Sequence, residues 1–567
     1  MMRGAQYLGD GRTSFAVWAP RRKHLDLCLQ RAGKTLQLPM QGDATGLFCV
    51  EADAAPGDLY SYEIDDLAVP DPVSRALPKV VHGPTEIVDP AYPWTDLSWK
   101  GVSFREYVLY ELHVGTFSPE GTFDGVIARL PYLKNLGVTA IELMPVSSFP
   151  GRWNWGYDGV SPYSVFAGYG GPAGLKRLVN AAHHIGLAIV LDVVYNHLGP
   201  EGNYLSLFGP YFTGKHQTPW GDAVNFDDEG AREVRSYFVQ NALYWCREFH
   251  VDGLRLDAVQ QIKDDSPRHI VAEITEAVKT FGRQAGREIA VIAETDENDA
   301  RQLRSAAQGG WGLDAVWSDD FHHSLYSLLT GESRAYYADF GQLQHLERAL
   351  REGFVYQGEH FSFWSKPRGT PPAGIELPSH VICVENHDQV GNRAQGDRMV
   401  ETADENSRRL AAALLCLSPH TPMIFMGQEQ DQLRRFMFFS DFGDEKLAEA
   451  VRKGRREEFP EFAAEDVPDP QSEQTFRESK LDWNLTVHQE EMIRWYRWLL
   501  QLRREFVTYS SRAIQVSREG AHLSIKVGDE PDTIRISVTV AGERGESRAK
   551  IFRFHIDQPR QPIRKAS

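Results

Sequence analysis

Eight short apolar runs alternate with amphipathic stretches through the middle of the chain, and this alternation constrains the fold more than any other feature of the sequence. Runs of this length that are rich in Val, Ile, Leu, Ala or Cys are typical of strands buried on both faces. Eight such strands with helical crossovers predict an α/β protein built on a closed (β/α)8 barrel, a TIM barrel. The expected strands are 108–114, 138–144, 187–193, 251–257, 289–293, 315–318, 381–385 and 423–427.

An open, doubly wound parallel sheet is the alternative for the same order of strands and helices. Sheets of that kind that bind nucleotides carry a glycine-rich phosphate loop after the first strand. The sequence that follows 108–114 has no such loop. The closed barrel is therefore the favoured prediction.

The length of the chain, 567 residues, is too great for one compact core, so two or three domains are expected. Residues 1–95 contain short alternating segments separated by Gly and Pro, which predicts a small antiparallel β domain. The barrel is expected at 96–506, where it ends in a helix near 488–506. Weak alternation over 507–567 predicts a small C-terminal β domain.

The acidic composition limits the class of partner. The chain has 61 Lys and Arg against 78 Asp and Glu, a net charge of −17, which argues against nucleic acid or an anionic membrane and favours a neutral substrate. Its five cysteines lie mostly in apolar runs, as expected of buried thiols in a reducing compartment. The N-terminal residues lack an apolar signal region and no stretch is long enough to span a bilayer, so we expect a cytoplasmic protein of undefined oligomeric state.

Four short acidic segments follow predicted strands. They read DVVYNH (192–197), GLRLDA (253–258), AETD (293–296) and ENHD (385–388). Charged residues at the ends of buried strands are costly to bury unless they are paired or used for chemistry. Because strand ends meet at one rim of a TIM barrel, these segments predict an active site that cleaves glycosidic bonds.

Asp257 and Glu294 are the candidates for the two carboxyl groups that cleavage of a glycosidic bond needs. Arg255 precedes Asp257 by two residues on one strand, so both side chains point to one face and the guanidinium keeps Asp257 ionised, as a nucleophile requires. Glu294 ends an apolar strand, where burial raises its pKa, as a general acid requires. Asp388 is the candidate for stabilising positive charge on the sugar ring. The structural alternative is an Arg255–Asp257 ion pair and a helix cap at Glu294.

Other side chains near these segments are candidates for sugar contacts. His197 can hydrogen-bond a sugar hydroxyl, whereas Asp192 is expected to brace Arg255 from within the barrel. Tyr157 is the candidate platform for a sugar face in a glycine-rich segment that also holds two tryptophans; the alternative is that two of these three rings fill the core. The sequence has neither HExxH-like spacing nor a dense His/Cys cluster, so no metal and no other cofactor is expected.

The four segments, in this order and across residues 105–430, resemble the α-amylase family of glycoside hydrolases. The resemblance implies that Asp257 is the nucleophile, Glu294 the proton donor and Asp388 the transition-state stabiliser. The N-terminal domain is similar to the β-sandwich that precedes the barrel in branching, debranching and trehalose-releasing members. The same resemblance implies a subsite for the attacked sugar lined by His197, Arg255 and His387, with Asn386 and Gln389 as further contacts.

Further segments are most similar to the trehalose-releasing members: DAVQQIKDDS (257–266), WSDDFHH (317–323) and NHDQVGNR (386–393). After Glu294 the chain reads TDEND (295–299), where branching enzymes typically have small residues and isoamylases Pro-Trp. The resemblance implies hydrolysis of the α-1,4-glucosidic bond next to the terminal trehalose of maltooligosyl-trehalose, with related α-1,4-glucans as partners. The candidates for binding the second glucose of trehalose are Asp319, Asp320, His322 and His323.

Two alternatives remain open. One is a glycogen branching or debranching enzyme of the same fold, and the other is a non-catalytic glucan-binding protein. The presence of Asp257, Glu294 and Asp388 together argues against a binding protein. One loop departs from the trehalose-releasing pattern, because 430–436 reads QDQLRRF where an aromatic residue and Thr-Pro-Phe are usual.

Overall fold

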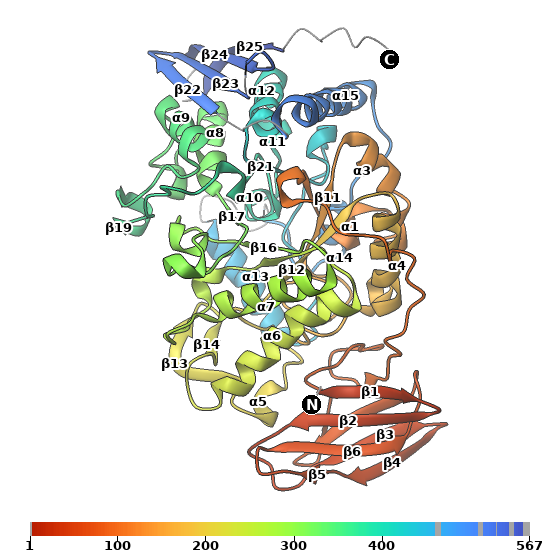
Figure 1. Ribbon diagram of the computed structural model, residues 1–567. Helices are drawn as coiled ribbons and strands as arrows, with labels where there is room; N and C mark the ends of the chain where they lie inside the picture. The colour runs from red at the N-terminus through yellow and green to blue at the C-terminus, as the bar shows by residue number, and fades with distance from the viewer. Residues whose placement is uncertain (1–2, 460–466, 509–513, 529, 544–548, 559–567) are drawn as a thin grey trace.

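The predicted barrel is present and closed (Figure 1). The computed structural model describes residues 3–459, 467–508, 514–528, 530–543 and 549–558. The ring closes where β10 pairs in parallel with β21, which excludes the open sheet. In ring order the strands are β10 (Leu109–Leu112), β11 (Ala140–Leu143), β12 (Ala188–Val193), β15 (Gly253–Leu256), β16 (Ala290–Ala293), β17 (Ala315–Trp317), β20 (His380–Cys383) and β21 (Thr421–Phe425), each within two residues of its expected ends.

Side chains alternate between the inside and the outside of the barrel along each strand. The inner positions toward the amino ends are apolar, and Leu109, Val190 and Ile292 pack there in one cluster. Two positions further along β10 and β12, the same alternation turns Glu111 and Asp192 inward. The barrel interior therefore changes from an apolar layer to a charged layer toward the carboxyl ends of its strands.

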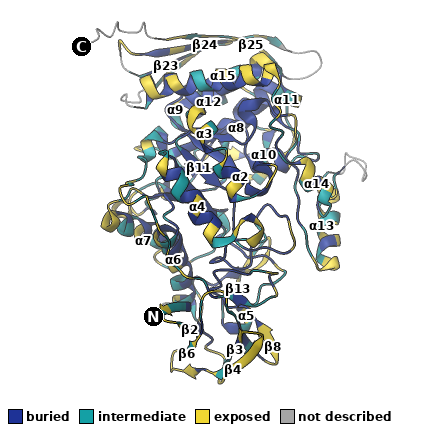
Figure 2. Ribbon diagram, turned by 90° about the vertical axis from the view of Figure 1, so that its right-hand side faces the viewer, coloured by how far each residue is buried: buried dark blue, intermediate teal, exposed yellow. Residues whose placement is uncertain are grey.

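Helices surround the barrel and turn their buried faces toward it (Figure 2). The helix predicted near 488–506 is α15, which continues as a π-helical turn over Arg503–Val507. The helices are α1 (Val114–Phe117), α2 (Phe123–Ile127), α3 (Leu130–Leu136), α4 (Gly171–His184), α5 (Leu205–Phe208), α6 (Ala231–Glu248), α7 (Ile270–Ala285), α8 (Asp319–Thr330), α9 (Leu343–Glu352), α10 (His387–Gly391), α11 (Met399–Thr402), α12 (Glu405–Leu417), α13 (Glu445–Glu458), α14 (Glu473–Glu478) and α15 (Val487–Leu502).

The N-terminal region is a β-sandwich, as the family resemblance implied. One sheet has the order β1-β2-β6-β5 and the other β4-β3-β7-β8, with β9 paired to β7. Phe15 of the first sheet and Tyr60 of the second meet edge to face, with ring centroids 4.9 Å apart. The strands are β1 (Gly4–Gly9), β2 (Arg12–Trp18), β3 (Asp26–Arg31), β4 (Lys34–Pro39), β5 (Gln41–Gly42), β6 (Leu47–Asp53), β7 (Leu59–Ile64), β8 (Leu67–Val69) and β9 (Thr85–Glu86).

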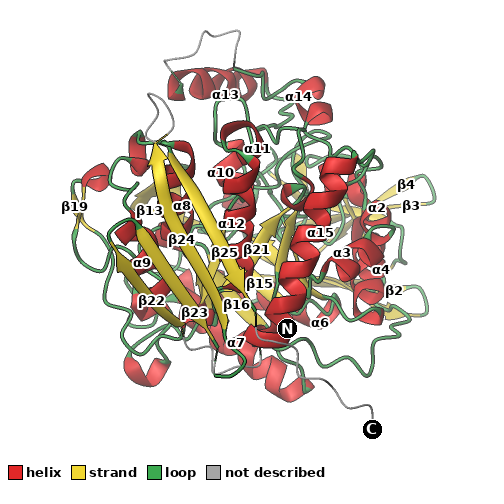
Figure 3. Ribbon diagram, turned by 90° about the horizontal axis from the view of Figure 1, so that it is seen from above, coloured by secondary structure: helices red, strands yellow, loops and turns green. Residues whose placement is uncertain are grey.

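The C-terminal region is an antiparallel sheet that lies at the opposite end of the molecule from the sandwich (Figures 1 and 3). It packs on the barrel helices, since Asn406 Nδ2 of α12 donates a 2.9 Å hydrogen bond to the Phe552 carbonyl. Parts of the predicted 507–567 domain (509–513, 529, 544–548 and 559–567) lie outside the described residues. The strands are β22 (Ile514–Glu519), β23 (His522–Val527), β24 (Ile534–Glu543) and β25 (Lys550–Asp557).

Two hairpins extend from the loops of the barrel. They are β13 (Phe212–Thr218) with β14 (Gly221–Val224), and β18 (His360–Phe361) with β19 (Lys366–Pro367). Within the described ranges, no helix combines the length and the hydropathy that crossing a bilayer requires.

Candidate active site

Arg255 is the centre of the predicted site. Its guanidinium is fully buried inside the barrel, and Nη1 lies 2.8 Å from both Asp192 Oδ2 and Asp257 Oδ1. The guanidinium carbon also lies 4.3 Å from the ring centroid of Trp317. Burial raises the pKa of Asp192 to about 7, although the nearby Arg255 opposes the shift. Asp192 thus braces Arg255 from within the barrel, as predicted.

Asp257 is held at both carboxylate oxygens. Arg255 contacts Oδ1, and Asn196 Nδ2 donates a 2.9 Å hydrogen bond to Oδ2. These contacts fix the direction of the carboxylate just beyond the end of β15. A carboxylate whose two oxygens are held in this way is oriented for attack on carbon.

Glu294 follows β16, and its environment disfavours the charged form of its carboxyl group. Burial raises its pKa well above the usual range; Arg255 opposes that shift, and the charges of Asp257 and Asp388 add to it. Glu294 Oε2 accepts a hydrogen bond from the backbone N–H of Ala258 and lies 3.7 Å from Arg255 Nη2. Asp257 and Glu294 therefore share one guanidinium, while the pKa of Glu294 favours a protonated carboxyl group.

Asp388 lies in the first turn of α10, and its side chain is 39% exposed. Beside it, His387 is buried with Nδ1 2.5 Å from Glu111 Oε1 and Nε2 3.4 Å from Asp388 Oδ1. Burial alone would lower the pKa of His387, but the charges of Asp388 and Glu111 raise it to about 9. A cationic imidazole thus lies directly below the exposed carboxylate.

Asn386 and Gln389 lie at the start of α10 and differ in their exposure. Asn386 is buried and caps α10, because its Oδ1 accepts a 2.7 Å hydrogen bond from the Gln389 backbone N–H. The Gln389 side chain accepts a 3.3 Å hydrogen bond from the Tyr337 hydroxyl. The cap contradicts the prediction that the Asn386 side chain is free for a sugar contact, whereas Gln389 remains partly accessible.

Tyr157 faces the charged layer, whereas the two neighbouring tryptophans fill the core. The Tyr157 hydroxyl donates a 2.7 Å hydrogen bond to Asp192 Oδ2, and its ring stacks on His387 at 5.1 Å. Trp153 and Trp155 are both buried, and Trp155 stacks on Phe436 at 5.2 Å. This contact connects the atypical 430–436 loop to the wall behind the site.

His197 lies at the end of the DVVYNH segment under an exposed aromatic ring. Its Nε2 lies 3.0 Å from the Tyr157 carbonyl oxygen, and burial lowers its pKa. The ring of Trp220 stacks on His197 with centroids 4.1 Å apart and planes 4° from parallel. Trp220 is 51% exposed at the turn of the β13–β14 hairpin, so it offers an open aromatic face beside the predicted sugar subsite.

The polar cluster after β17 is mostly turned inward. Asp320 is fully buried and accepts hydrogen bonds from Asn298 and from the backbone N–H groups of Val355 and Tyr356, and its other oxygen lies 2.9 Å from Arg368 Nη1. These contacts hold the fully buried carboxylate inside the protein, which contradicts the prediction that Asp320 binds the second glucose.

The two histidines of this cluster are buried as well. His322 lies 2.7 Å from the Val384 carbonyl oxygen and 2.8 Å from the Tyr337 hydroxyl, so it links α8 to its neighbours and is also wrongly predicted as a sugar contact. His323 packs among Tyr336, Tyr337 and Phe340, and burial lowers its pKa well below the usual value. This packing contradicts its predicted contact with the second glucose.

Asp319 differs from the rest of the cluster, because it is partly exposed. Burial raises its pKa to about 7; Arg368 opposes that shift, and the charges of Asp388 and Asp296 add to it. Asp319 therefore faces the same rim as Asp388, and of the four predicted residues it is the one placed for a substrate contact.

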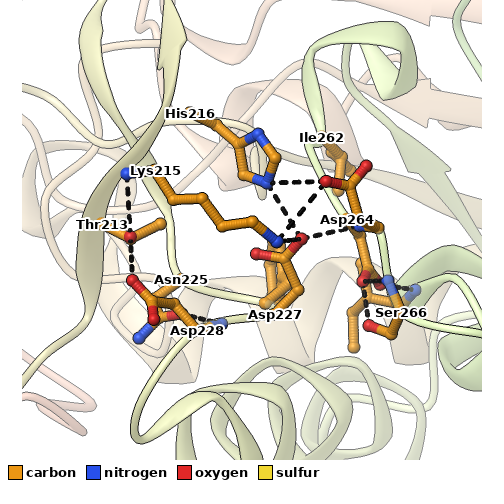
Figure 4. A network of polar contacts seen from close by, with 12 residues as sticks. Thr213, Lys215, His216, Asn225, Asp227, Asp228, Ile262, Asp264 and Ser266 are labelled. Carbon is orange, nitrogen blue, oxygen red and sulfur yellow. Dashed lines mark hydrogen bonds and ion pairs between the residues drawn. The ribbon is translucent and has the colours of Figure 1, made fainter.

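A polar network attaches the β13–β14 hairpin to the loop that follows Asp257 (Figure 4). His216, Asp227 and Asp265 lie close enough together to share a metal ion. Figure 4 shows Lys215, His216 and Asp227 of this network. Lys215 Nζ lies 2.9 Å from Asp227 Oδ2 and 3.4 Å from Asp265 Oδ2, so an ammonium group already supplies positive charge there. The Asp265 backbone N–H also donates a 2.7 Å hydrogen bond to Asp227, which ties the two loops together.

Several residues of the site were missed from the sequence. Glu111 and Glu142 occupy inner positions of β10 and β11, Asn196 holds Asp257, and Trp220 covers His197. A signal for the first two was present, because each is an acidic residue within a short apolar run. Trp220 lies in a hairpin whose position depends on long-range contacts, so no local pattern indicates its role.

The fold and the site together define a glycoside hydrolase, since an acid and a carboxylate share one guanidinium at the rim of a TIM barrel. Comparisons with known proteins agree. Residues 92–208 match the model for the α-amylase catalytic domain, and residues 3–81 match carbohydrate-binding module 48, the isoamylase N-terminal domain.

Curated relatives extend over almost the whole chain. A protein of Saccharolobus solfataricus named malto-oligosyltrehalose trehalohydrolase is 44% identical over 521 residues, which cover 92% of this chain and 90% of that protein. A protein of the same name from Deinococcus radiodurans is 42% identical and covers 94% of this chain and 87% of its own length. A crystal structure described as a putative α-amylase from Salmonella typhimurium has a TM-score of 0.89 at 39% identity and covers 98% of this chain and 99% of its own.

The chain therefore belongs to the malto-oligosyltrehalose trehalohydrolases of the α-amylase family.

Proposed function

We propose that the protein hydrolyses the α-1,4-glucosidic bond next to the terminal trehalose of maltooligosyl-trehalose and releases trehalose. The observation that carries the chemistry is the Arg255 guanidinium shared by Asp257 and Glu294, together with the raised pKa of Glu294. The shared name of relatives that are 44% and 42% identical over nearly the whole chain supports the substrate.

The reaction is a double displacement that retains the anomeric configuration. In the first step Asp257 attacks the anomeric carbon of the glucose that precedes trehalose, and Glu294 donates its proton to the glycosidic oxygen. The bond from carbon to oxygen breaks, trehalose leaves, and a glycosyl ester with Asp257 forms. In the second step Glu294 removes a proton from water, and the resulting hydroxide displaces Asp257 to release the maltooligosaccharide.

Asp388 stabilises the oxocarbenium-like transition state. Its exposed carboxylate places negative charge at the rim, and the buried His387 beneath it fixes that carboxylate in place. His387, His197 and Tyr157 form the wall against which the attacked sugar lies. We assign these three residues as its contacts, because they pack together through the Tyr157–His387 stack and the Tyr157–His197 contact.

Selection of trehalose depends on groups beyond the point of cleavage. Asp319 faces the rim near Asp388 and Asp296, and we assign it as a hydrogen-bond partner for the leaving trehalose. A site built to hydrogen-bond sugar hydroxyls discriminates strongly against substrates that leave those partners unpaired. We also propose that the enzyme works in the cytoplasm, because its five cysteines, all within the described residues, form no disulfide bond with one another.

The test is an incubation of the protein with maltopentaosyl-trehalose and, separately, with maltoheptaose and amylose. The expected products of the first substrate are trehalose and maltopentaose, with much slower cleavage of the plain glucans. New α-1,6 linkages in the amylose sample would instead establish a branching enzyme. Binding of both substrates without any product, while the Saccharolobus relative turns them over in parallel, would establish a non-catalytic glucan-binding protein.

A further inference from the structure

A large cavity lies between the N-terminal sandwich and the outer face of α6. Its volume is about 850 Å³, and its walls come from the first sheet of the sandwich, residues 73 and 75, the 90–94 segment and one side of α6. Figures 1 and 2 show the sandwich on this side of the barrel. Small-molecule sites commonly have volumes of about 300 to 1,000 Å³, whereas voids in a packed interior hold at most a few waters. The cavity is therefore large enough for a ligand of several rings.

Aromatic rings form one wall of the cavity. Trp94 is partly exposed there and stacks on His250, with ring centroids 3.9 Å apart and planes 16° from parallel. Tyr92 meets Trp94 edge to face at 4.8 Å. These contacts hold the Trp94 ring in a fixed orientation, and such a ring is a platform for the C–H face of a pyranose.

Two arginines and two glutamates in the wall form ion pairs, and the further cation in the wall, Arg247, has its guanidinium carbon 5.5 Å from the ring centroid of Phe281. Arg3 contacts Glu233, and Arg75 Nη2 lies 3.2 Å from Glu248 Oε2. Lys176 Nζ lies 3.5 Å from the other oxygen of Glu248. An anionic ligand would have to compete with these carboxylates for the arginines, so the electrostatics favour a neutral ligand.

Neutral polar groups complete the lining. Gln240 and Thr45 are exposed there from α6 and from the sandwich, and Gln6 and Ser236 are partly exposed. Amides and hydroxyls both donate and accept hydrogen bonds, as a sugar hydroxyl requires. A fixed aromatic platform, paired charges and neutral donors around one cavity match the chemistry of an uncharged sugar.

We propose that this cavity binds a short neutral gluco-oligosaccharide of two or three units, with one pyranose stacked on Trp94 and hydroxyls hydrogen-bonded to Gln240. The site is separate from the reaction described above. Its walls lie on the outer face of α6 and on the sandwich, whereas the three carboxylates lie at the carboxyl ends of the barrel strands. Binding there joins the sandwich and the barrel through the ligand.

The test counts bound sugar by equilibrium dialysis with radiolabelled maltotriose. The background is the full chain with Asp257→Asn, which prevents any hydrolysis during the measurement. Gln240→Trp fills the cavity, Trp94→Ala removes the platform, and Arg232→Trp places the same bulk on an exposed position of α6 outside the cavity. Circular dichroism and thermal unfolding establish that each variant is folded.

At saturation, the Asp257→Asn chain and its Arg232→Trp derivative are expected to bind one more maltotriose per chain than the Gln240→Trp and Trp94→Ala derivatives. Equal stoichiometry in all four proteins would overturn the proposal, as would a loss that also occurs with Arg232→Trp. The comparison does not depend on which glucan the barrel cleaves. A failure of the trehalose-release assay and a failure here are therefore distinguishable.

Discussion

Arg255 shows how one buried charge sets the chemical state of its neighbours. The guanidinium is in contact with Asp192 and Asp257 and lies close to Glu294. Burial without full pairing raises the pKa of Glu294, whereas Asp257 receives both Arg255 and Asn196. Burial thus favours Glu294 as the acid, and the two contacts that orient the Asp257 carboxylate suit it to nucleophilic attack.

Replacing the nucleophile gives the most direct test at this scale. Asp257→Asn is expected to reduce kcat by roughly 10⁴- to 10⁶-fold, because an amide is too poor a nucleophile to form the glycosyl ester. The variant should still fold, since the amide occupies the same volume beside Arg255. Initial rates on maltopentaosyl-trehalose measure the effect, with the exposed Glu51→Gln as a control. A folded variant with near-normal turnover would remove Asp257 from the mechanism.

The raised pKa of Glu294 predicts the alkaline side of the pH profile. Glu294 must be protonated to act as an acid, so kcat/KM should fall as the pH rises through its raised pKa. Glu294→Gln should lose this alkaline limb and most activity on maltopentaosyl-trehalose. It should retain far more activity on α-maltosyl fluoride, because fluoride leaves without a proton. A Glu294→Gln profile with an unchanged alkaline limb would assign the limb to another group.

At the scale of elements, the β13–β14 hairpin brings Trp220 over His197 and is attached to the loop after Asp257. Burial opposes the shift, but hydrogen bonds from Lys215, the Asp265 backbone and His216 lower the pKa of Asp227 to about 2. Asp227 therefore stays ionised across the neutral range. The contacts between the hairpin and the loop after Asp257 are consequently kept throughout the neutral pH range.

Trp220→Ala should weaken substrate use without unfolding the protein. An aromatic contact contributes about 0.5–1.5 kcal/mol beyond buried area, so kcat/KM should fall by about 2- to 13-fold. Trp220→Phe keeps a ring over His197 and should recover most of the loss. Steady-state kinetics on maltopentaosyl-trehalose compare the two variants with the parent. Equal losses for Ala and Phe would show that the ring face is not what the substrate uses.

The sequence predicts the features that arise from residues close together along the chain. It does not predict those that depend on contacts between distant segments. The strand positions follow from local alternation, and their ends were predicted to within two residues. The same alternation places the side chains of Arg255 and Asp257 on one face. The roles of Asp320 and His322 were predicted wrongly, because their partners, Arg368 and Tyr337, come from segments that are joined only in the folded chain. Polar residues after a strand can face the rim or the interior, and local pattern does not distinguish the two.

At the scale of the whole molecule, the sandwich is fastened to the barrel by aromatic contacts. Trp18 of β2 is buried and meets Tyr211 of the barrel edge to face at 5.6 Å, and Tyr62 meets Phe208 at 5.9 Å. The Tyr237 hydroxyl of α6 donates a 2.7 Å hydrogen bond to the Pro72 carbonyl. The two regions should therefore unfold together.

Trp18→Ala tests this coupling. Loss of a buried tryptophan costs about 3–5 kcal/mol, and that loss should lower the midpoint of one common unfolding transition. Urea unfolding followed by both tryptophan fluorescence and circular dichroism measures it. Leu8→Ala, at a 49% exposed position in the same sheet, should change stability by no more than about 0.5 kcal/mol. Two separate transitions, with only the earlier one shifted, would show that the sandwich folds independently.

The lysine in the hairpin network has a broader consequence. At a place where a histidine and two aspartates lie close enough to bind a divalent ion, the Lys215 ammonium group supplies positive charge from within the polypeptide. A covalently tethered ammonium cannot be diluted away or removed by a chelator. The contact between the hairpin and the loop after Asp257 thus has a counter-ion of its own in the Lys215 ammonium group.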